Sequence, residues 1–277
     1  MAEEKVRNNG KEQEVNFQEW VEQKRARRTA LYNKVDEMAD KALSDKGVLF
    51  NYLTVQAKLG KISVANSLLI AAQNPKATNL RSFEEWKQRG RSVNSGEKGI
   101  DILAPDGEYE RSDGTIGMNF EAKKVFDVSQ TSGGKVFQRK NPPVKNALKA
   151  LMTNAPVHIH LDDTIAKNIG ALYSEDEKVI CVARGLESEK LFFSVARELA
   201  RADGCDNTFL CDCAANIACI RYGIAPQDFD QISEEFHALE TREKRDALSI
   251  IRDTACKITE RIDLNLQAER NKNEPER

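Results

Sequence analysis

The sequence predicts an α+β protein, with a helix-plus-antiparallel-sheet front half and a mostly helical second half. Between residues 17 and 45, apolar side chains such as Trp20, Leu31 and Val35 recur at spacings near three and four, as in an amphipathic helix. Between residues 99 and 130, "GIDILAP" and "MNFEAKKVFDVSQ" alternate apolar and polar positions around the turn "SDGT", which predicts a hairpin. Long helical patterns at 187–203, 207–222 and 231–265 fill most of the rest.

Two shorter helices are predicted between the first helix and the hairpin. In "ISVANSLLIAAQNP", Ser63 caps an apolar helix that Pro75 ends, and in "RSFEEWKQRG", Ser82 and Glu85 form a capping box. A third short helix near 144–153 and the strands "VHIHL" and "KVICVA" begin the second half. Gly- and Pro-containing stretches at 132–143 indicate a linker.

This linker sets the expected domain boundaries. We predict one domain at 13–135 and a second at 144–265, with the charged ends 1–12 and 266–277 disordered.

Composition narrows the class of protein. The 277-residue chain is 40% hydrophobic and 31% charged, and its longest purely apolar run, "SLLIAA", is far too short to cross a bilayer. The first residues lack the apolar region of a secretory signal, so we expect a cytoplasmic protein with no membrane partner. Its six cysteines are then expected to stay reduced.

The net charge of −2 hides an uneven distribution. Residues 53–98 carry eight basic and three acidic side chains, whereas residues 205–240 carry one basic and seven acidic ones. A basic front half suggests an anionic partner. In "NPKATNLRSFEEWKQRGRSVNSGEKG", cations, aromatic residues and glycines alternate, which suits the phosphates and unstacked bases of a single strand. The alternative from composition alone is an amphipathic helix with a solvated charged face and two core aromatics.

A resemblance extends the nucleic-acid interpretation. "SVANSLLIAAQNPKAT", "FEEWKQRGRSVNSGEKGIDILAP" and "KKVFDVSQT" resemble the N-terminal domain of ArdC-type antirestriction proteins, which is related to the single-stranded-DNA-binding part of TraC-type primases. The resemblance implies sequence-independent binding of single-stranded DNA. Trp86 has two possible roles, base stacking and core packing, and the core is the favoured one. The candidate nucleic-acid-binding residues are Asn74, Lys76, Thr78, Arg81, Trp86, Lys87, Arg89, Arg91, Gly96, Lys98, Lys123 and Lys124.

The second half resembles the zincin-like metallopeptidase domain that follows this domain in the ArdC family. The zinc motif H-E-x-x-H would fall on the helix "SEKLFFSVARELARADG", where this chain has Arg197, Glu198 and Arg201. Guanidinium has donors and no acceptor, so neither arginine can ligate zinc. Glu198 keeps the position of the general base but has no metal-bound water to activate. We therefore expect no metal, no cofactor and no peptidase activity.

Other uses of these residues remain open. Glu198 and Arg201 can form an ion pair at spacing three, while Arg197 and Arg201 need a carboxylate between them, from Asp203 or Asp212, or a bound phosphate. Cysteines 205, 211 and 213 match no ordinary zinc knuckle with His237, which favours buried thiols. His158 and His160 share one face of a strand, but no third ligand is evident, so a structural role is favoured.

The expected function is single-stranded DNA binding by an antirestriction-type protein of a mobile element, a plasmid or conjugative transposon. The second domain would be a scaffold or a platform for a partner, such as a host restriction enzyme or a conjugation component. Two alternatives belong to other classes: a metal-dependent hydrolase built around Glu198, Asp212 and cysteines, and a protein-interaction module whose basic surface binds an acidic partner such as a restriction enzyme subunit.

Overall fold

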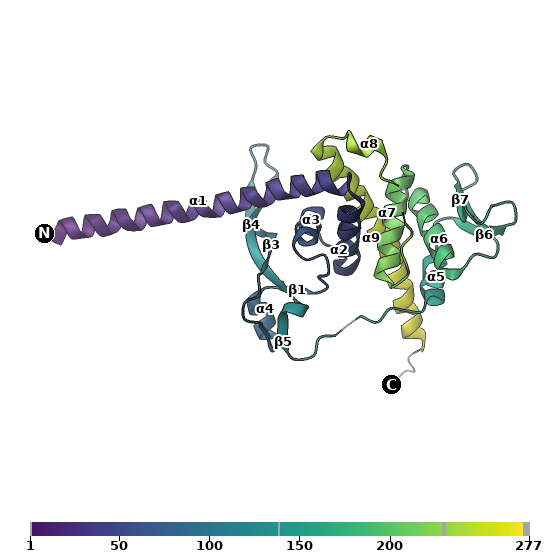
Figure 1. Cartoon of the computed structure of the whole chain (residues 1–277), viewed down its shortest axis with the longest axis horizontal. Helices are drawn as coiled ribbons and strands as arrows, with labels where there is room; N and C mark the ends of the chain where they lie inside the picture. The colour runs from purple at the N-terminus through teal and green to yellow at the C-terminus, as the bar shows by residue number, and fades with distance from the viewer. Residues whose placement is uncertain (1, 138, 229–230, 274–277) are drawn as a thin grey trace.

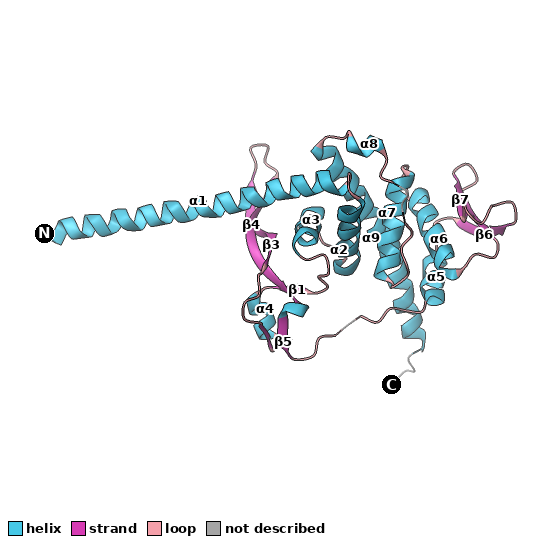
Figure 2. Cartoon of the chain, in the orientation of Figure 1, coloured by secondary structure: helices cyan, strands magenta, loops and turns pink. Residues whose placement is uncertain are grey.

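The computed structural model describes residues 2–137, 139–228 and 231–273 (Figure 1). Helices dominate, and the strands form three small sheets (Figure 2), which confirms the predicted α+β class. The front half contains α1 (Ala2–Ala42), α2 (Lys46–Leu59), α3 (Val64–Gln73), β1 (Leu80–Arg81), α4 (Phe83–Gln88), β2 (Arg91–Val93), β3 (Ile100–Glu110), β4 (Ile116–Asp127) and β5 (Thr131–Gly133). The second half contains α5 (Val144–Met152), β6 (His158–Asp162), β7 (Ala171–Ser174), β8 (Val179–Ala183), α6 (Ser188–Ala202), α7 (Thr208–Arg221), α8 (Glu234–His237) and α9 (Thr241–Asn273).

Helices extend further than the sequence pattern predicts. Helix α1 already begins at Ala2, within the end that we predict to be disordered from the sequence. Helix α9 runs to Asn273 through most of the predicted C-terminal tail, whose last residues, 274–277, lie outside the described part. Both ends are rich in Glu, Lys, Gln and Arg, which have high helix propensity. A helix can therefore continue through them although they form no apolar face. None of the described helices combines the length and the apolar character needed to cross a bilayer.

Helix α2 has no counterpart in the sequence prediction, which ends the first helix near residue 45. Asp45 begins α2, because its Oδ1 accepts a hydrogen bond from the backbone N–H of Val48 at 2.9 Å. Gly47 therefore lies in the first turn of a new helix. The predicted 231–265 helix is divided into α8 and α9 at residues 238–240.

The predicted hairpin is present as β3 and β4, paired antiparallel with Ile100 opposite Val125 and Leu103 opposite Ala122. Strand β3 lies at the edge of the order β1–β4–β3, and helix α3 covers that edge. Asn66 exchanges two 2.9 Å hydrogen bonds with the backbone of Leu103, and Gln73 does the same with Asp101. Two amide side chains, two helical turns apart, thus take the place of a neighbouring strand.

The two halves of the chain share one hydrophobic core. It contains residues of α1, α2 and α3 together with residues of α6, α7 and α9, and the hydroxyl of buried Tyr52 donates to the carbonyl of Leu248 at 3.0 Å. The segment between β5 and α5 does connect the halves as predicted, yet they pack against each other over α2, α7 and α9 (Figure 1). The boundary at 136–143 therefore does not separate two independent cores.

Asp127, at the end of β4, holds the turn that follows α3. Its buried carboxylate accepts backbone N–H bonds from Thr78 at 2.7 Å and Asn79 at 2.9 Å, and bonds from the N–H and hydroxyl of Ser129. Burial alone would raise the pKa of Asp127, but the bonds from Asn79, Ser129 and Thr78 outweigh it and hold the pKa below its ordinary value. The carboxylate thus fixes the "NPKATN" turn against the sheet.

We predict that Asp127→Ala lowers the free energy of unfolding by about 2–4 kcal/mol, because it leaves buried N–H donors without an acceptor. The pKa of Asp127 is lowered in the fold, so its contribution is present at neutral pH and is lost as the pH falls through the folded-state value. Urea denaturation at pH 7 and at pH 3 measures both effects. The control is Asp113→Ala, which removes a similar Asp–Thr115 turn on the exposed hairpin tip and should cost little.

Candidate nucleic-acid interface

Trp86 belongs to the core. Its side chain is 0% exposed, and its indole N–H donates to the carbonyl of Phe126 at 2.9 Å. The guanidinium carbons of Arg81 and Arg91 lie 5.9 and 5.8 Å from its ring centroid. The ring therefore has no face to offer to a base, and its inclusion among the nucleic-acid-binding residues is wrong. The favoured alternative of core packing accounts for the residue instead.

Arg91 is occupied by the protein itself. Its Nε donates to the hydroxyl of Thr131 at 2.8 Å, one terminal nitrogen donates to the Thr131 carbonyl at 2.7 Å, and the other contacts the carbonyls of Gly133 and Gly134. These bonds tie strand β2 to β5 beyond their backbone pairing. Four of the five guanidinium N–H groups of Arg91 are thus used within the fold, so we assign Arg91 first to shaping this surface.

The loop "NSGEKG" is bound by the side chain of Gln130 on one side and is exposed to solvent on the other. Gln130 donates to the carboxylate of Glu97 and to the carbonyl of Lys98, both at 2.9 Å. Gly96 has φ +82, and a Cβ placed there would meet nothing within 4 Å. Lys98 makes no side-chain hydrogen bond or ion pair with any described residue. It shares a hollow of about 730 Å³ with Asn74 and Lys124, so three of the predicted residues do come together.

The remaining predicted residues are spread more widely. Lys76, Lys87 and Arg89 are exposed, and their side chains form no hydrogen bond or ion pair within the described part of the chain. Lys123 pairs with Glu121 at 3.0 Å. Thr78 lines a different hollow together with Phe137 and Arg139, toward the segment that joins the two halves.

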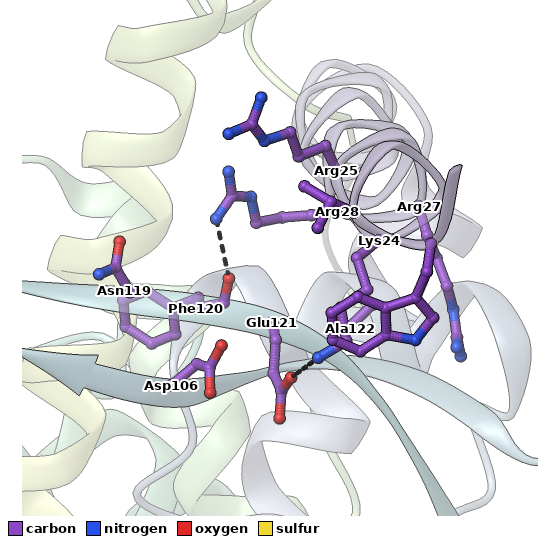
Figure 3. Close-up of a pocket in the computed structure, with 11 residues that line it drawn as sticks. Lys24, Arg25, Arg27, Arg28, Asp106, Asn119, Phe120, Glu121 and Ala122 are labelled. Atoms are coloured by element: carbon purple, nitrogen blue, oxygen red, sulfur yellow. Dashed lines mark hydrogen bonds and ion pairs between the residues drawn. The ribbon is translucent and has the colours of Figure 1, made fainter. Parts of the chain in front are cut away.

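A second basic cluster, on helix α1, is absent from the sequence prediction. Lys24, Arg25, Arg27 and Arg28 line a hollow of about 460 Å³ between α1 and strand β4 (Figure 3). Lys24 pairs with Glu121 at 3.2 Å, and Arg27 pairs with Asp101. Arg25 and Arg28 extend side by side on the Asn119 side of the hollow (Figure 3). Arg25 makes no ion pair with the described residues, and Arg28 makes only a long 3.5 Å bond to the Phe120 carbonyl.

Asp101 connects the α1 hollow to the hollow around Lys98. Its carboxylate binds Arg27 of α1 on one side and Lys124 of β4, at 3.0 Å, on the other. Burial would raise the pKa of Asp101, but hydrogen bonds from these two cations lower it below its ordinary value. The ionised carboxylate fixes both cations and leaves Arg25, Arg28 and Lys98 uncompensated. We call the following set of residues the cationic track: Arg25, Arg27, Arg28, Lys98, Lys124 and Asn74.

In the second half, Glu198 is the centre of a buried ion-pair cluster. Its side chain is 1% exposed. One oxygen accepts from Arg197 Nε at 2.6 Å, and the other accepts from the backbone N–H of Tyr173 at 2.9 Å and lies 3.6 Å from Arg201. Arg197 also donates to the carbonyls of Ile169 and Ala171, at 3.1 and 2.9 Å. The predicted Glu198–Arg201 pair is thus present, and Asp203 pairs with Arg261 instead of bridging the two arginines.

Asp212 on α7 is only partly compensated. It lies 4.0 Å from Arg197, and its buried Oδ1 has no hydrogen-bond partner among the described residues. Burial raises the pKa of Asp212 to about 6; Arg197 opposes that shift and Glu198 adds to it.

Cysteines 205, 211 and 213 are buried free thiols, as the sequence favours. A hydrogen bond from Cys211 lowers the pKa of Cys205 to about 7 despite its burial. The Sγ of Cys211 also lies 3.1 Å from the carbonyl oxygen of Cys205. His237, their proposed partner, is exposed on α8.

The chain matches no protein-family model and no curated protein. Among solved structures it is similar to the metal-free antirestriction ArdC protein from the R388 plasmid, with 18% identity, a TM-score of 0.46, and coverage of 75% of this chain and 85% of that one. The Mn(II)-bound structure of that protein gives 15% identity, a TM-score of 0.49, and coverage of 73% and 86%. Both solved structures are of an antirestriction ArdC protein, and ArdC-type proteins are also the family that the front-half motifs resemble in sequence. With sequence identities this low, the two structural similarities assign no activity to the chain.

We predict that Asp212→Asn raises the free energy of unfolding by about 1–3 kcal/mol at pH 8. Because the folded-state pKa of Asp212 is about 6, above its unfolded value, the wild type loses stability as the pH rises from 4 to 6, and the variant should not. Denaturation midpoints between pH 4 and 8 test this. The control is Asp206→Asn, which removes an exposed carboxylate from the hollow that Asp212 also lines and should change the stability little. A curve of stability against pH for Asp212→Asn that runs parallel to the wild-type curve would contradict the account.

Proposed function

We propose that the protein binds single-stranded DNA without sequence preference through the cationic track, as an antirestriction-type protein of a mobile element. The observation that carries the proposal is the pair of basic hollows that Asp101 joins. Together they place uncompensated guanidinium and ammonium groups on both sides of one fixed carboxylate. A flexible single strand can follow such a series of cations with successive phosphates.

Aromatic and amide groups beside the cations suit the rest of a nucleotide. Trp20 lines the α1 hollow and is 51% exposed, with Lys24 Nζ 4.4 Å from its ring centroid; Phe83, at the start of α4, is 50% exposed but lines neither hollow. Asn119 and Asn74 each add an amide to one of the two hollows. Exposed rings accept stacked bases of any identity, and amides bind sugars and phosphates, which supports binding without sequence preference.

We further propose that the second half has no peptidase activity and is a scaffold or partner platform. Both oxygens of Glu198 are taken by Arg197, Arg201 and the N–H of Tyr173, which supports a structural role. A general base needs a lone pair directed at a water, and here each oxygen faces a donor. By the resemblance of the front half, the bound strand would be shielded from host restriction by occlusion.

The first test removes the uncompensated arginines of α1. We expect Arg25→Ala/Arg28→Ala to weaken binding of a labelled single strand by about tenfold at low salt, and to reduce the slope of log affinity against log salt by about 1.4, since each lost phosphate contact removes about 0.7. Fluorescence anisotropy at several salt concentrations measures both. The control, Arg184→Ala, removes an exposed arginine that pairs with Asp163 in the second half. Equal losses in the variant and the control would contradict the proposal.

The second test distinguishes a residue that contacts DNA from a residue that only stabilises the fold. Lys98→Ala should weaken binding and lower the salt slope while the melting temperature stays the same, because its ammonium group is uncompensated. Arg91→Ala should lower the melting temperature, because it removes the four hydrogen bonds that the Arg91 side chain donates across the β2–β5 contact. Anisotropy and thermal melts of the two variants are compared side by side. An Arg91→Ala variant with unchanged stability and a reduced salt slope would return Arg91 to the phosphate contacts.

A further inference from the structure

Three side chains with metal-ligating atoms gather on the outer face of the sheet β6–β8–β7. Strands β6 and β8 are parallel, with His160 opposite Cys181 and Asp162 opposite Ala183. Since side chains alternate along a strand, His160 and Asp162 share the face of Cys181. The other face carries Ile180 and Val182, which are buried in the core. The cluster is therefore open to solvent and rests on a packed sheet.

The separation of His160 and Cys181 matches that of two ligands around one zinc ion, and Asp162 lies close to both. The ligand atoms of His160, Asp162 and Cys181 all lie within 4.8 Å of one another, and Cys181 Sγ is 3.5 Å from His160 Nε2. Zinc–sulfur and zinc–nitrogen bonds of about 2.3 and 2.05 Å at a tetrahedral angle place the two ligand atoms about 3.5 Å apart. The observed distance thus fits a shared ion without rearrangement of the sheet.

Asp162 is already oriented for this role. Its Oδ1 accepts bonds from the N–H and the hydroxyl of Thr164, both at 2.7 Å, and its carboxylate also interacts with the Cys181 thiol. Metal-ligating carboxylates are commonly fixed by such outer hydrogen bonds. His160 and Cys181 are adjacent across the two strands, so neither backbone has to move.

We propose that His160 Nε2, Cys181 Sγ and the carboxylate of Asp162 bind one Zn(II) ion, with water in the fourth position. Imidazole, thiolate and carboxylate are the three ligand types that zinc takes in proteins. His160 thus finds its partner ligands in Asp162 and Cys181, and His158 is not part of the site. The sheet separates this site from helix α6: the backbone of Tyr173 on β7 is what faces Glu198. The site is thus unrelated to the H-E-x-x-H position.

Zinc binding to the purified full chain tests the proposal. Competition with a chromophoric chelator should give one Zn(II) per chain with submicromolar affinity, and Co(II) should give a thiolate-to-metal charge-transfer band. Cys181→Ser should abolish the band, and Cys181→Ser, His160→Ala and Asp162→Asn should each weaken zinc binding at least tenfold. Circular dichroism should show all three folded, because their side chains lie on the outer face of the sheet.

Matched controls distinguish this site from others in the chain. His158→Ala removes a histidine from the same face, and Cys256→Ser removes a half-exposed thiol elsewhere; both should bind zinc like the wild type. Absence of zinc binding in the wild type would overturn the proposal. The proposal would also be overturned if zinc binding persisted in Cys181→Ser but were lost in Cys211→Ser or Asp212→Asn. That result would locate the zinc site at the buried thiols or at the Glu198 cluster.

Discussion

The buried carboxylate of Glu198 is the constraint on which the second half depends. A charge that is 1% exposed is costly unless it is paired, and here two guanidinium groups and a backbone N–H surround it. Arg197 extends the same network to the carbonyls of residues 169 and 171, so α6 is joined to β7 and to the loop before it. The two arginines that stand where the H-E-x-x-H motif has histidines are thus the groups that compensate the buried charge of Glu198.

In the front half, much of the ArdC-like signature serves the fold. Asn66 and Gln73 cover the edge of β3, Trp86 fills the space under α4, and Asp127 fixes the turn after α3. These residues explain why the motif is long without each position touching a ligand. Beside them lies a set of cations on α1, on the 94–98 loop and on β4, of which Asp101 pairs with Arg27 and Lys124 and leaves the others uncompensated. The surface proposed to bind DNA is therefore a product of the same hydrogen bonds that build the sheet.

Sequence periodicity was sufficient for the hairpin, for α3, α4 and α5, and for most of α6 and α7, because each has a clear apolar pattern, and α3, α4 and α7 also have side-chain caps. It did not show which cations are already occupied: Arg91 and Lys98 look alike in sequence, yet one is bound to Thr131 and the other is not. The arginines of α1 were missed because they fall outside the basic window at 53–98. The cluster at His160, Asp162 and Cys181 depends on the register of a parallel pair, which no local spacing reveals.

The most direct measurement of the central claim is an anisotropy titration of the intact wild-type chain with single- and double-stranded oligonucleotides of equal length, at two ionic strengths, with and without EDTA. If unpaired strands are held by cations and by no metal, the single strand binds more tightly, its affinity falls steeply with salt, and the chelator changes nothing. Binding that is insensitive to salt, or that EDTA abolishes, would contradict the account.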